Sequence, residues 1–169
     1  MRLIGFLIVG MMLANPALAQ KPDKAARKAA KAKEISEIVT NKQYRFIAQK
    51  TMTSGGRNVT LTSEYDLVVD SLQAKAFLPF FGRAYSVDYA SQDGGFKFNE
   101  KTENYTMSFN EKKGLYQISF QVKTKNDQLQ VFLSVGTGGY ASLTINSNNR
   151  ETISYYGEVV ALQKEIIKT

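Results

Sequence analysis

The chain contains neither cysteine nor histidine in its 169 residues. Without cysteine it has no disulfide, no thiolate nucleophile and no zinc–thiolate site. Without histidine it lacks the general base of Ser-His-Asp and Cys-His catalysis, and also the commonest metal ligand in proteins. These two absences exclude most nucleophilic hydrolase mechanisms and most transition-metal sites.

Other binding and catalytic motifs are missing too. The glycines at 136, 138 and 139 join two expected strands and open no helix, so they form no phosphate-binding loop. No Asp-x-Asp-x-Asp spacing indicates a calcium loop. We therefore expect a protein that is not an enzyme, with no catalytic residue, no metal and no cofactor. A carboxylate-based hydrolase is only a third alternative, and its candidates by residue type alone are Asp66, Asp70, Asp88, Asp93, Glu100 and Glu103.

The first 19 residues have the three parts of a secretory signal peptide. Arg2 lies beside the amino terminus, residues 3–13 are uncharged and apolar, and Ala17-Leu18-Ala19 is a small-x-small cleavage site. The apolar run is shorter than the roughly 20 residues that a membrane-spanning helix needs. We expect cleavage after Ala19 and a periplasmic or secreted protein. No cysteine follows the cleavage site, so attachment through a lipidated cysteine is excluded.

Almost all of the net charge of +7 comes from the start of the chain. Residues 1–33 hold seven basic residues and one acidic residue, a net charge of +6. Residues 34–169 hold the other fifteen basic and fourteen acidic residues, a net charge of +1. Because a nucleic-acid-binding domain should carry its basic surface on the fold itself, we expect no nucleic-acid partner.

Residues 20–41 are expected to form a basic helical lead-in. Alanine is frequent there and favours helix, and Ile35, Ile38 and Val39 form an apolar stripe that should dock on the domain. A run of basic residues usually belongs to a solvated helix. The alternative is contact with an anionic membrane or polysaccharide surface. The residues available for that contact are Lys21, Lys24, Arg27, Lys28, Lys31 and Lys33.

Residues 42–169 are expected to form a single β domain, because apolar and polar residues alternate along several segments. The clearest segments are 104–109, 116–123, 128–135 and 141–146. Weaker strand signals cover residues 44–52, 59–69, 74–78, 84–89, 96–99 and 152–162. Such alternation is typical of antiparallel sheets with one buried face. About eight to ten short strands separated by turn residues predict a monomeric, lipocalin-like barrel or a curved β-sandwich.

Three sequence motifs carry a resemblance to a known family. They are Leu78-Pro79-Phe80-Phe81-Gly82-Arg83-Ala84-Tyr85, Gly94-Gly95-Phe96-Lys97-Phe98 and Arg150-Glu151-Thr152-Ile153-Ser154-Tyr155-Tyr156-Gly157. In this order they resemble the domain-of-unknown-function family 4251, exported proteins of Gram-negative gut-type bacteria, over residues 44–160. The resemblance implies export and a β fold, and the family has no established activity. Many members of such families are lipoproteins, and the missing cysteine departs from that pattern.

The first motif is the one local anomaly. Pro79 should end a strand and Gly82 should allow a turn, while adjacent Phe80 and Phe81 should point to opposite faces. Two interpretations are open. In the first, the segment is a structural corner in which Arg83 is partly buried and paired with an acid. In the second it contacts a ligand, and the candidate ligand-binding residues are Phe80, Phe81, Arg83, Tyr85 and Tyr156.

Two functional hypotheses of different classes follow. The first is a non-enzymatic envelope protein that binds a small apolar or amphipathic ligand in the barrel mouth, which an eight-stranded barrel can hold. The second is a structural or interaction module whose barrel is plugged by its own side chains. Such a module would bind a protein or a glycan through a loop face. The presence or absence of an interior cavity distinguishes the two.

Overall fold

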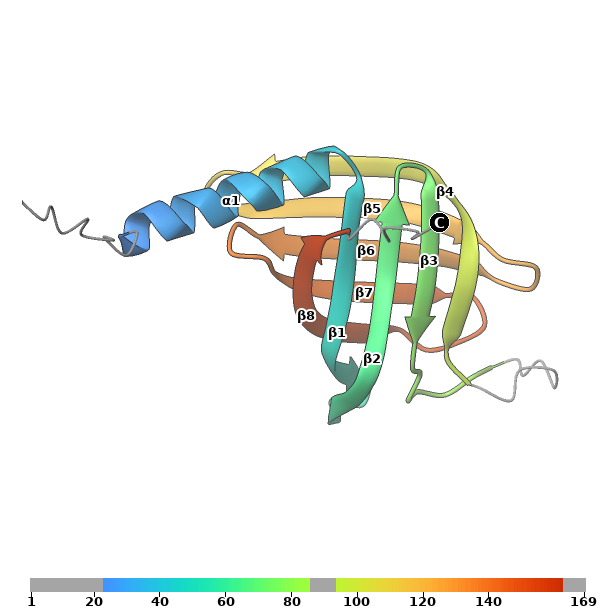
Figure 1. Cartoon of the computed structure of the whole chain (residues 1–169). Helices are drawn as coiled ribbons and strands as arrows, with labels where there is room; N and C mark the ends of the chain where they lie inside the picture. Colours follow the sequence, from blue (N-terminus) through green and yellow to red (C-terminus); the bar gives the residue numbers. More distant parts are fainter. Residues whose placement is uncertain (1–22, 86–93, 163–169) are drawn as a thin grey trace, which may run out of the picture.

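The computed structural model describes residues 23–85 and 94–162 of the chain. One amino-terminal helix precedes eight strands that form a closed antiparallel barrel, in which every strand pairs with its neighbours in sequence and the last pairs with the first (Figure 1). The all-β barrel with an amino-terminal helix confirms the predicted fold class. The elements are α1 (Lys24–Thr40), β1 (Gln43–Thr53), β2 (Asn58–Asp70), β3 (Gln73–Leu78), β4 (Phe96–Asn110), β5 (Leu115–Lys123), β6 (Gln128–Gly136), β7 (Tyr140–Ser147) and β8 (Ile153–Ala161).

Strand β4 is longer than the sequence pattern indicated. Residues 96–99 and 104–109 were expected as separate strands, but they belong to one strand whose register shifts between Glu103 and Thr106. Asn104 has a φ of 52° at this irregularity. A bulge interrupts the period-two pattern, so the sequence shows two short runs where the backbone is continuous. Of the strand expected at residues 84–89, Ala84 forms only an isolated bridge with Arg150, and residues 86–89 lie outside the described residues.

The inward-facing side chains of all eight strands form one continuous apolar cluster. The largest of its fully buried members on the strands, with no more than 1% of their surface exposed, include Tyr44, Tyr155, Phe46, Phe120, Leu67, Leu78, Leu133 and Leu143. Burial of a side chain of this size stabilises the fold by about 1.5–3 kcal/mol before entropy is counted. The strands therefore close around their own side chains.

Pairing of β1 with β8 closes the barrel. The register of this pair shifts between Ala48 and Lys50, and Gly157 lies opposite Ala48 at the shift. A Cβ atom on Gly157 would overlap the carbonyl oxygen of Ile47 and lie 2.9 Å from its carbonyl carbon. The backbones of β1 and β8 thus approach so closely here that only glycine fits.

Helix α1 docks through its carboxyl-terminal half. Ile35 and Val39 are fully buried in the cluster, whereas residues 24–30 are all exposed. In Figure 1 this exposed half projects beyond the barrel wall. The chain leaves the helix through Lys42, whose φ is 54° and whose carbonyl accepts a hydrogen bond from the Ser71 amide at 2.8 Å. Among the described residues, no helix is long and apolar enough to cross a membrane.

Removal of residues 21–33 should leave the barrel intact. The described part of this segment buries no large apolar side chain, while the anchors Ile35 and Val39 remain. We expect the thermal midpoint to change by less than about 5 °C, which corresponds to about 1 kcal/mol in a domain of this size. A circular-dichroism melt compares the two chains. A much larger fall would show that the amino-terminal half of the helix contributes to the core.

Candidate functional site

The segment after β3 forms a corner at one end of the barrel. Pro79 follows the last residue of β3, and its carbonyl accepts a hydrogen bond from the buried Tyr155 hydroxyl at 2.6 Å. The Phe80 ring packs edge-on against Phe96, with centroids 5.6 Å apart. Burial raises the pKa of Tyr155 above its ordinary value, so this hydroxyl stays a donor. The corner is thereby tied to β4 and β8.

Arg83 does not hold this corner through its side chain, contrary to the first of the two interpretations of this segment. The residue is exposed, and within the described residues its guanidinium forms no ion pair. Its backbone instead exchanges two hydrogen bonds with Glu151. The Arg83 amide donates to the Glu151 carboxylate at 3.2 Å, and the Glu151 amide donates to the Arg83 carbonyl at 3.0 Å. The hydroxyl of Ser54 and then the Arg83 amide lower the pKa of this exposed carboxylate.

The cation among the aromatic rings is Arg150. Its guanidinium carbon lies 5.5 Å from the Phe80 centroid and 5.2 Å from the Phe96 centroid. One terminal nitrogen donates to the carbonyls of Gly94 and Gly95 at 2.9 and 3.0 Å. The three sequence motifs therefore meet at this corner. Sequence reasoning missed Arg150 because neighbours along the chain pointed to Arg83.

The five candidate ligand-binding residues do not form one site. Phe80 is half-buried and packed, while Phe81 and Tyr85 are exposed. Tyr156 lies on the outer surface of β8, where it is opposite Ser142 of β7 and Lys50 of β1. The corner thus carries four of the five residues, and Tyr156 belongs to a different surface.

The barrel interior has few polar groups. Tyr44 and Tyr105 share a hydrogen bond between their hydroxyls at 3.4 Å, and burial raises the pKa of both. Lys42 lies 4.5 Å from the centroid of the Tyr105 ring. In the described part of the chain, no buried side-chain nitrogen or oxygen lacks a hydrogen-bond partner. No orphaned polar atom therefore points inward to orient a ligand.

The candidate acids are dispersed. Asp66 pairs with Arg45 at 2.7 Å, and Asp70 accepts a hydrogen bond from Gln43 at 3.2 Å. Asp88 and Asp93 lie outside the described residues, and Glu100 and Glu103 are exposed positions of β4. Residues 23–85 and 94–162 contain no group of three or more acidic side chains that could hold a metal ion.

The cations of helix α1 fall into two groups. Lys31 and Lys33 pair with Glu34 and Glu37 at 3.0 and 3.9 Å. Lys24, Arg27 and Lys28 form no ion pair with any described residue, and they lie in the exposed half of the helix. Lys21 and the expected signal peptide lie outside the described residues. Contact of this basic segment with an anionic surface stays a prediction.

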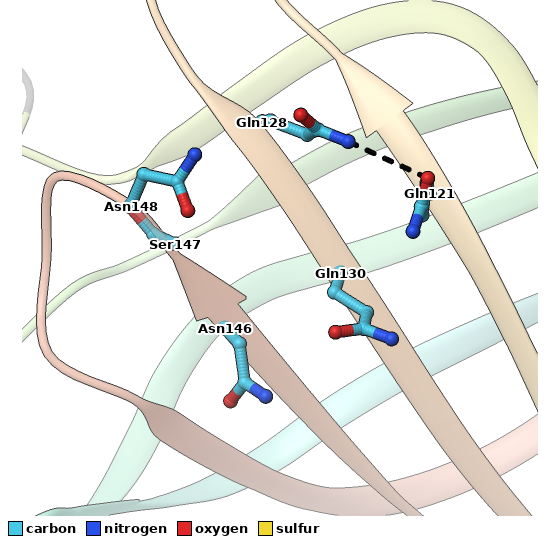
Figure 2. A pocket seen from close by; sticks show the side chains of 6 residues that line it. All are labelled: Gln121, Gln128, Gln130, Asn146, Ser147 and Asn148. Carbon is cyan, nitrogen blue, oxygen red and sulfur yellow. Dashed lines mark hydrogen bonds between the residues drawn. The ribbon is translucent and has the colours of Figure 1, made fainter.

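A pocket of about 230 Å³ lies on the outside of the barrel at the ends of β5, β6 and β7. Figure 2 shows the six side chains that line it, and its dashed line marks the hydrogen bond that the Gln128 amide donates to the Gln121 oxygen at 3.4 Å. All six are polar and none is ionisable: Gln121, Gln128, Gln130, Asn146, Ser147 and Asn148. In the sequence, Gln121, Gln128, Gln130 and Asn146 were only the polar half of alternating segments, and Ser147 and Asn148 were turn residues.

The pocket is one end of a larger surface, which we call the uncharged face. It consists of ten outward residues of three paired strands, none of which is ionisable: Gln117, Ser119, Gln121, Gln128, Gln130, Phe132, Ser134, Ser142, Thr144 and Asn146. Two ionisable outward residues of the same strands border it, Lys123 opposite Gln128 and Tyr140 opposite Glu158. Phe132 lies at its centre, between Ser119 of β5 and Thr144 of β7, and has 39% of its surface exposed. A charged residue also borders it on β4, where Glu103 is opposite Gln121, and further charges such as Arg45 and Asp66 lie on the outer side of β1 and β2.

Comparison with known proteins gives one family and one fold. Residues 26–159 match the model of the domain of unknown function DUF4251. The crystal structure of a DUF4251 family protein from Bacteroides eggerthii DSM 20697 is similar, with a TM-score of 0.61 and 20% sequence identity over 79% of this chain and 91% of that chain. At this identity the likeness concerns the fold. No curated protein sequence matches the chain.

Proposed function

The chain belongs to the DUF4251 family of domains of unknown function, and we propose that it is an exported, non-enzymatic binding module that acts through its outer surface. The observation that carries this proposal is the contrast between the two sides of the barrel wall. Inward positions are filled by the apolar cluster, and outward positions of β5–β7 form the uncharged face with its pocket.

The filled interior favours this function over a ligand in the barrel mouth. A drug-sized ligand needs about 300–1,000 Å³ of space, together with polar groups that orient it. Here Tyr44, Phe46, Phe120 and Tyr155 occupy the interior with almost no exposed surface. A ligand inside would have to displace side chains that stabilise the fold.

A non-enzymatic role is favoured by the chemistry of the side chains. The chain has no histidine and no cysteine, and the acids described above do not converge on one point. General acid–base chemistry needs a titratable group within hydrogen-bond reach of the reacting atom. The lining of the outer pocket offers amide and hydroxyl groups, which bind and do not exchange protons near neutral pH.

Mass spectrometry of the protein purified from the envelope of its own host tests this function. The denatured chain should have the mass of residues 20–169, because we propose that cleavage follows Ala19. The native protein should carry no apolar small molecule, because in this proposal the barrel is filled by its own side chains. An intact Met1 in the exported fraction would refute the export. An apolar molecule that stays bound in the native protein and is lost on denaturation would refute the filled barrel.

A further inference from the structure

We propose that the uncharged face binds a neutral oligosaccharide, with Phe132 as its stacking platform and the amide pocket holding one sugar unit. This inference rests on the proposed outer-surface function and names the class of its ligand. Four features of the surface carry it: the absence of ionisable groups, the available amides, the central aromatic ring and the rigid backbone beneath them.

The absence of charge is local. About a fifth of the residues in the chain are charged, yet none belongs to the ten residues of the uncharged face. Lys123, opposite Gln128, and Glu103, opposite Gln121, lie at its border. The nearby carboxylate of Asp127 accepts hydrogen bonds from the Ser147 hydroxyl at 2.6 Å and the Asn148 amide at 3.2 Å, and does not line the pocket. A surface whose centre carries no charge, and whose border carries both signs, offers little net attraction to an anionic or cationic ligand.

The pocket amides keep hydrogen-bonding capacity for a ligand. Within the described residues the side chain of Gln130 forms no hydrogen bond. The Gln121 oxygen accepts from Asn104 at 3.1 Å and from Gln128 at 3.4 Å, which leaves its NH₂ group available. The Asn146 oxygen accepts from Thr152 at 3.0 Å, and its NH₂ group is available too. Each amide has two N–H donors, which suits the closely spaced hydroxyls of a sugar.

Phe132 supplies the apolar part of such a site. It lies two residues beyond Gln130 on the same face of β6, so the ring flanks the pocket. The C–H side of a sugar ring is apolar and packs on an aromatic face. Short hydroxyl side chains surround the ring and leave it accessible: Ser119, Ser134 and Thr144.

The strands hold these groups at fixed spacing. Gln121, Gln130 and Asn146 are direct cross-strand partners on β5, β6 and β7. Neighbouring strands lie about 4.8 Å apart, so the three amides form a row across the sheet. Flanking hydroxyl pairs tie the face to β4 and β8, with Thr106 and Ser119 at 2.8 Å and Thr144 and Ser154 at 2.9 Å. A preorganised surface loses little entropy when it binds.

A protein partner fits this face less well. The centre of a protein–protein interface is enriched in aromatic and apolar residues. Phe132 is the only apolar member of the uncharged face, and Tyr156 lies just beyond it, opposite Ser142. A polyhydroxylated ligand matches the many amides and hydroxyls better.

Calorimetric titration of the mature chain with hexasaccharides tests the proposal. The neutral probes are maltohexaose, cellohexaose, mannohexaose and chitohexaose, and hexagalacturonate is the charged control. We expect at least one neutral probe to bind, with an affinity that does not change between about 0.05 and 0.5 M salt, because no ion pair is formed. Binding of chitohexaose alone would indicate an N-acetylated wall glycan, and binding of the unmodified sugars would indicate a glycan from outside the envelope.

Two variants and a matched control locate the site. Phe132→Ala should weaken binding about tenfold by removing the stacking surface, and Gln130→Ala should weaken it several-fold. Phe77→Ala is the control, since Phe77 has a similar exposed fraction of 42% but lies on β3 opposite Asp66 and Lys97. Each variant is first checked for an unchanged thermal midpoint.

The outcomes separate this inference from the proposed function. If no neutral hexasaccharide binds at millimolar concentration, or if Phe77→Ala weakens binding as much as Phe132→Ala, the oligosaccharide site is refuted. If Phe132→Ala instead abolishes binding to a purified envelope protein, the ligand class is wrong and the outer-surface function stands. A small apolar ligand retained inside the barrel refutes the function itself.

Discussion

Gly157→Ala should reduce the free energy of unfolding by about 3 kcal/mol, the upper part of the range for overpacked positions. The added Cβ would overlap the carbonyl oxygen of Ile47 and approach Ala48 Cα to 3.2 Å. These are backbone atoms, which cannot rotate away as a flexible side chain can. Relief requires β1 and β8 to separate, and this pair closes the barrel. The urea midpoint measures the effect.

Gly138→Ala is the control for this experiment. Gly138 lies in the turn between β6 and β7, and its added Cβ would meet only Tyr140 at an ordinary 3.9 Å. Replacement of a glycine whose conformation suits alanine is neutral or slightly stabilising. If Gly157→Ala also unfolded at the original midpoint, the close approach of the two strands would be wrong.

Arg150→Ala should reduce the free energy of unfolding by about 3 kcal/mol, whereas Arg83→Ala should change it by less than about 0.5 kcal/mol. Arg150 donates to two carbonyls and lies over the rings of Phe80 and Phe96. Its removal leaves both carbonyls without this charged donor and exposes the two rings. The Arg83 side chain is exposed, and alanine keeps the backbone bonds to Glu151.

Arg150→Lys distinguishes the contribution of the positive charge at this corner from that of the planar guanidinium group. Lysine keeps the positive charge but lacks the planar group that packs flat on aromatic rings. We expect an intermediate loss of stability in a urea titration of the three variants. If Arg83→Ala were as damaging as Arg150→Ala, the assignment of the corner cation would have to be reversed.

The strands were predictable where burial alternates without interruption. Along β6 every second residue from Leu129 to Val135 is buried, and the sequence shows the same alternation. Along β4 the bulge near Asn104 breaks the period, so the sequence suggested two strands. The alternation of apolar and polar residues follows a regular strand backbone. It therefore fails to predict one continuous strand where a bulge changes the register.

The corner and the uncharged face depend on partners that are distant in the chain. Arg83 was favoured because aromatic residues flank it in the sequence, but the residue that reaches Phe80 in space is Arg150. The sequence did not predict the uncharged face, because only the strand register places Gln121, Gln130 and Asn146 in one row. Its one sequence signal was Phe132, an aromatic residue at an outward position of an alternating strand.

The order of strand pairing has a consequence for how the chain folds. Seven of the eight pairs join strands that are adjacent in sequence, so they can form as local hairpins. The pair β1–β8 joins the two ends of the domain, from Tyr44 with Ala161 to Thr53 with Ile153. Long-range pairs form slowly because a large loop must close first. If the chain is exported as proposed, the barrel cannot close until β8 has emerged from the translocation channel. The polypeptide can therefore pass through the channel before the β1–β8 pair closes the barrel.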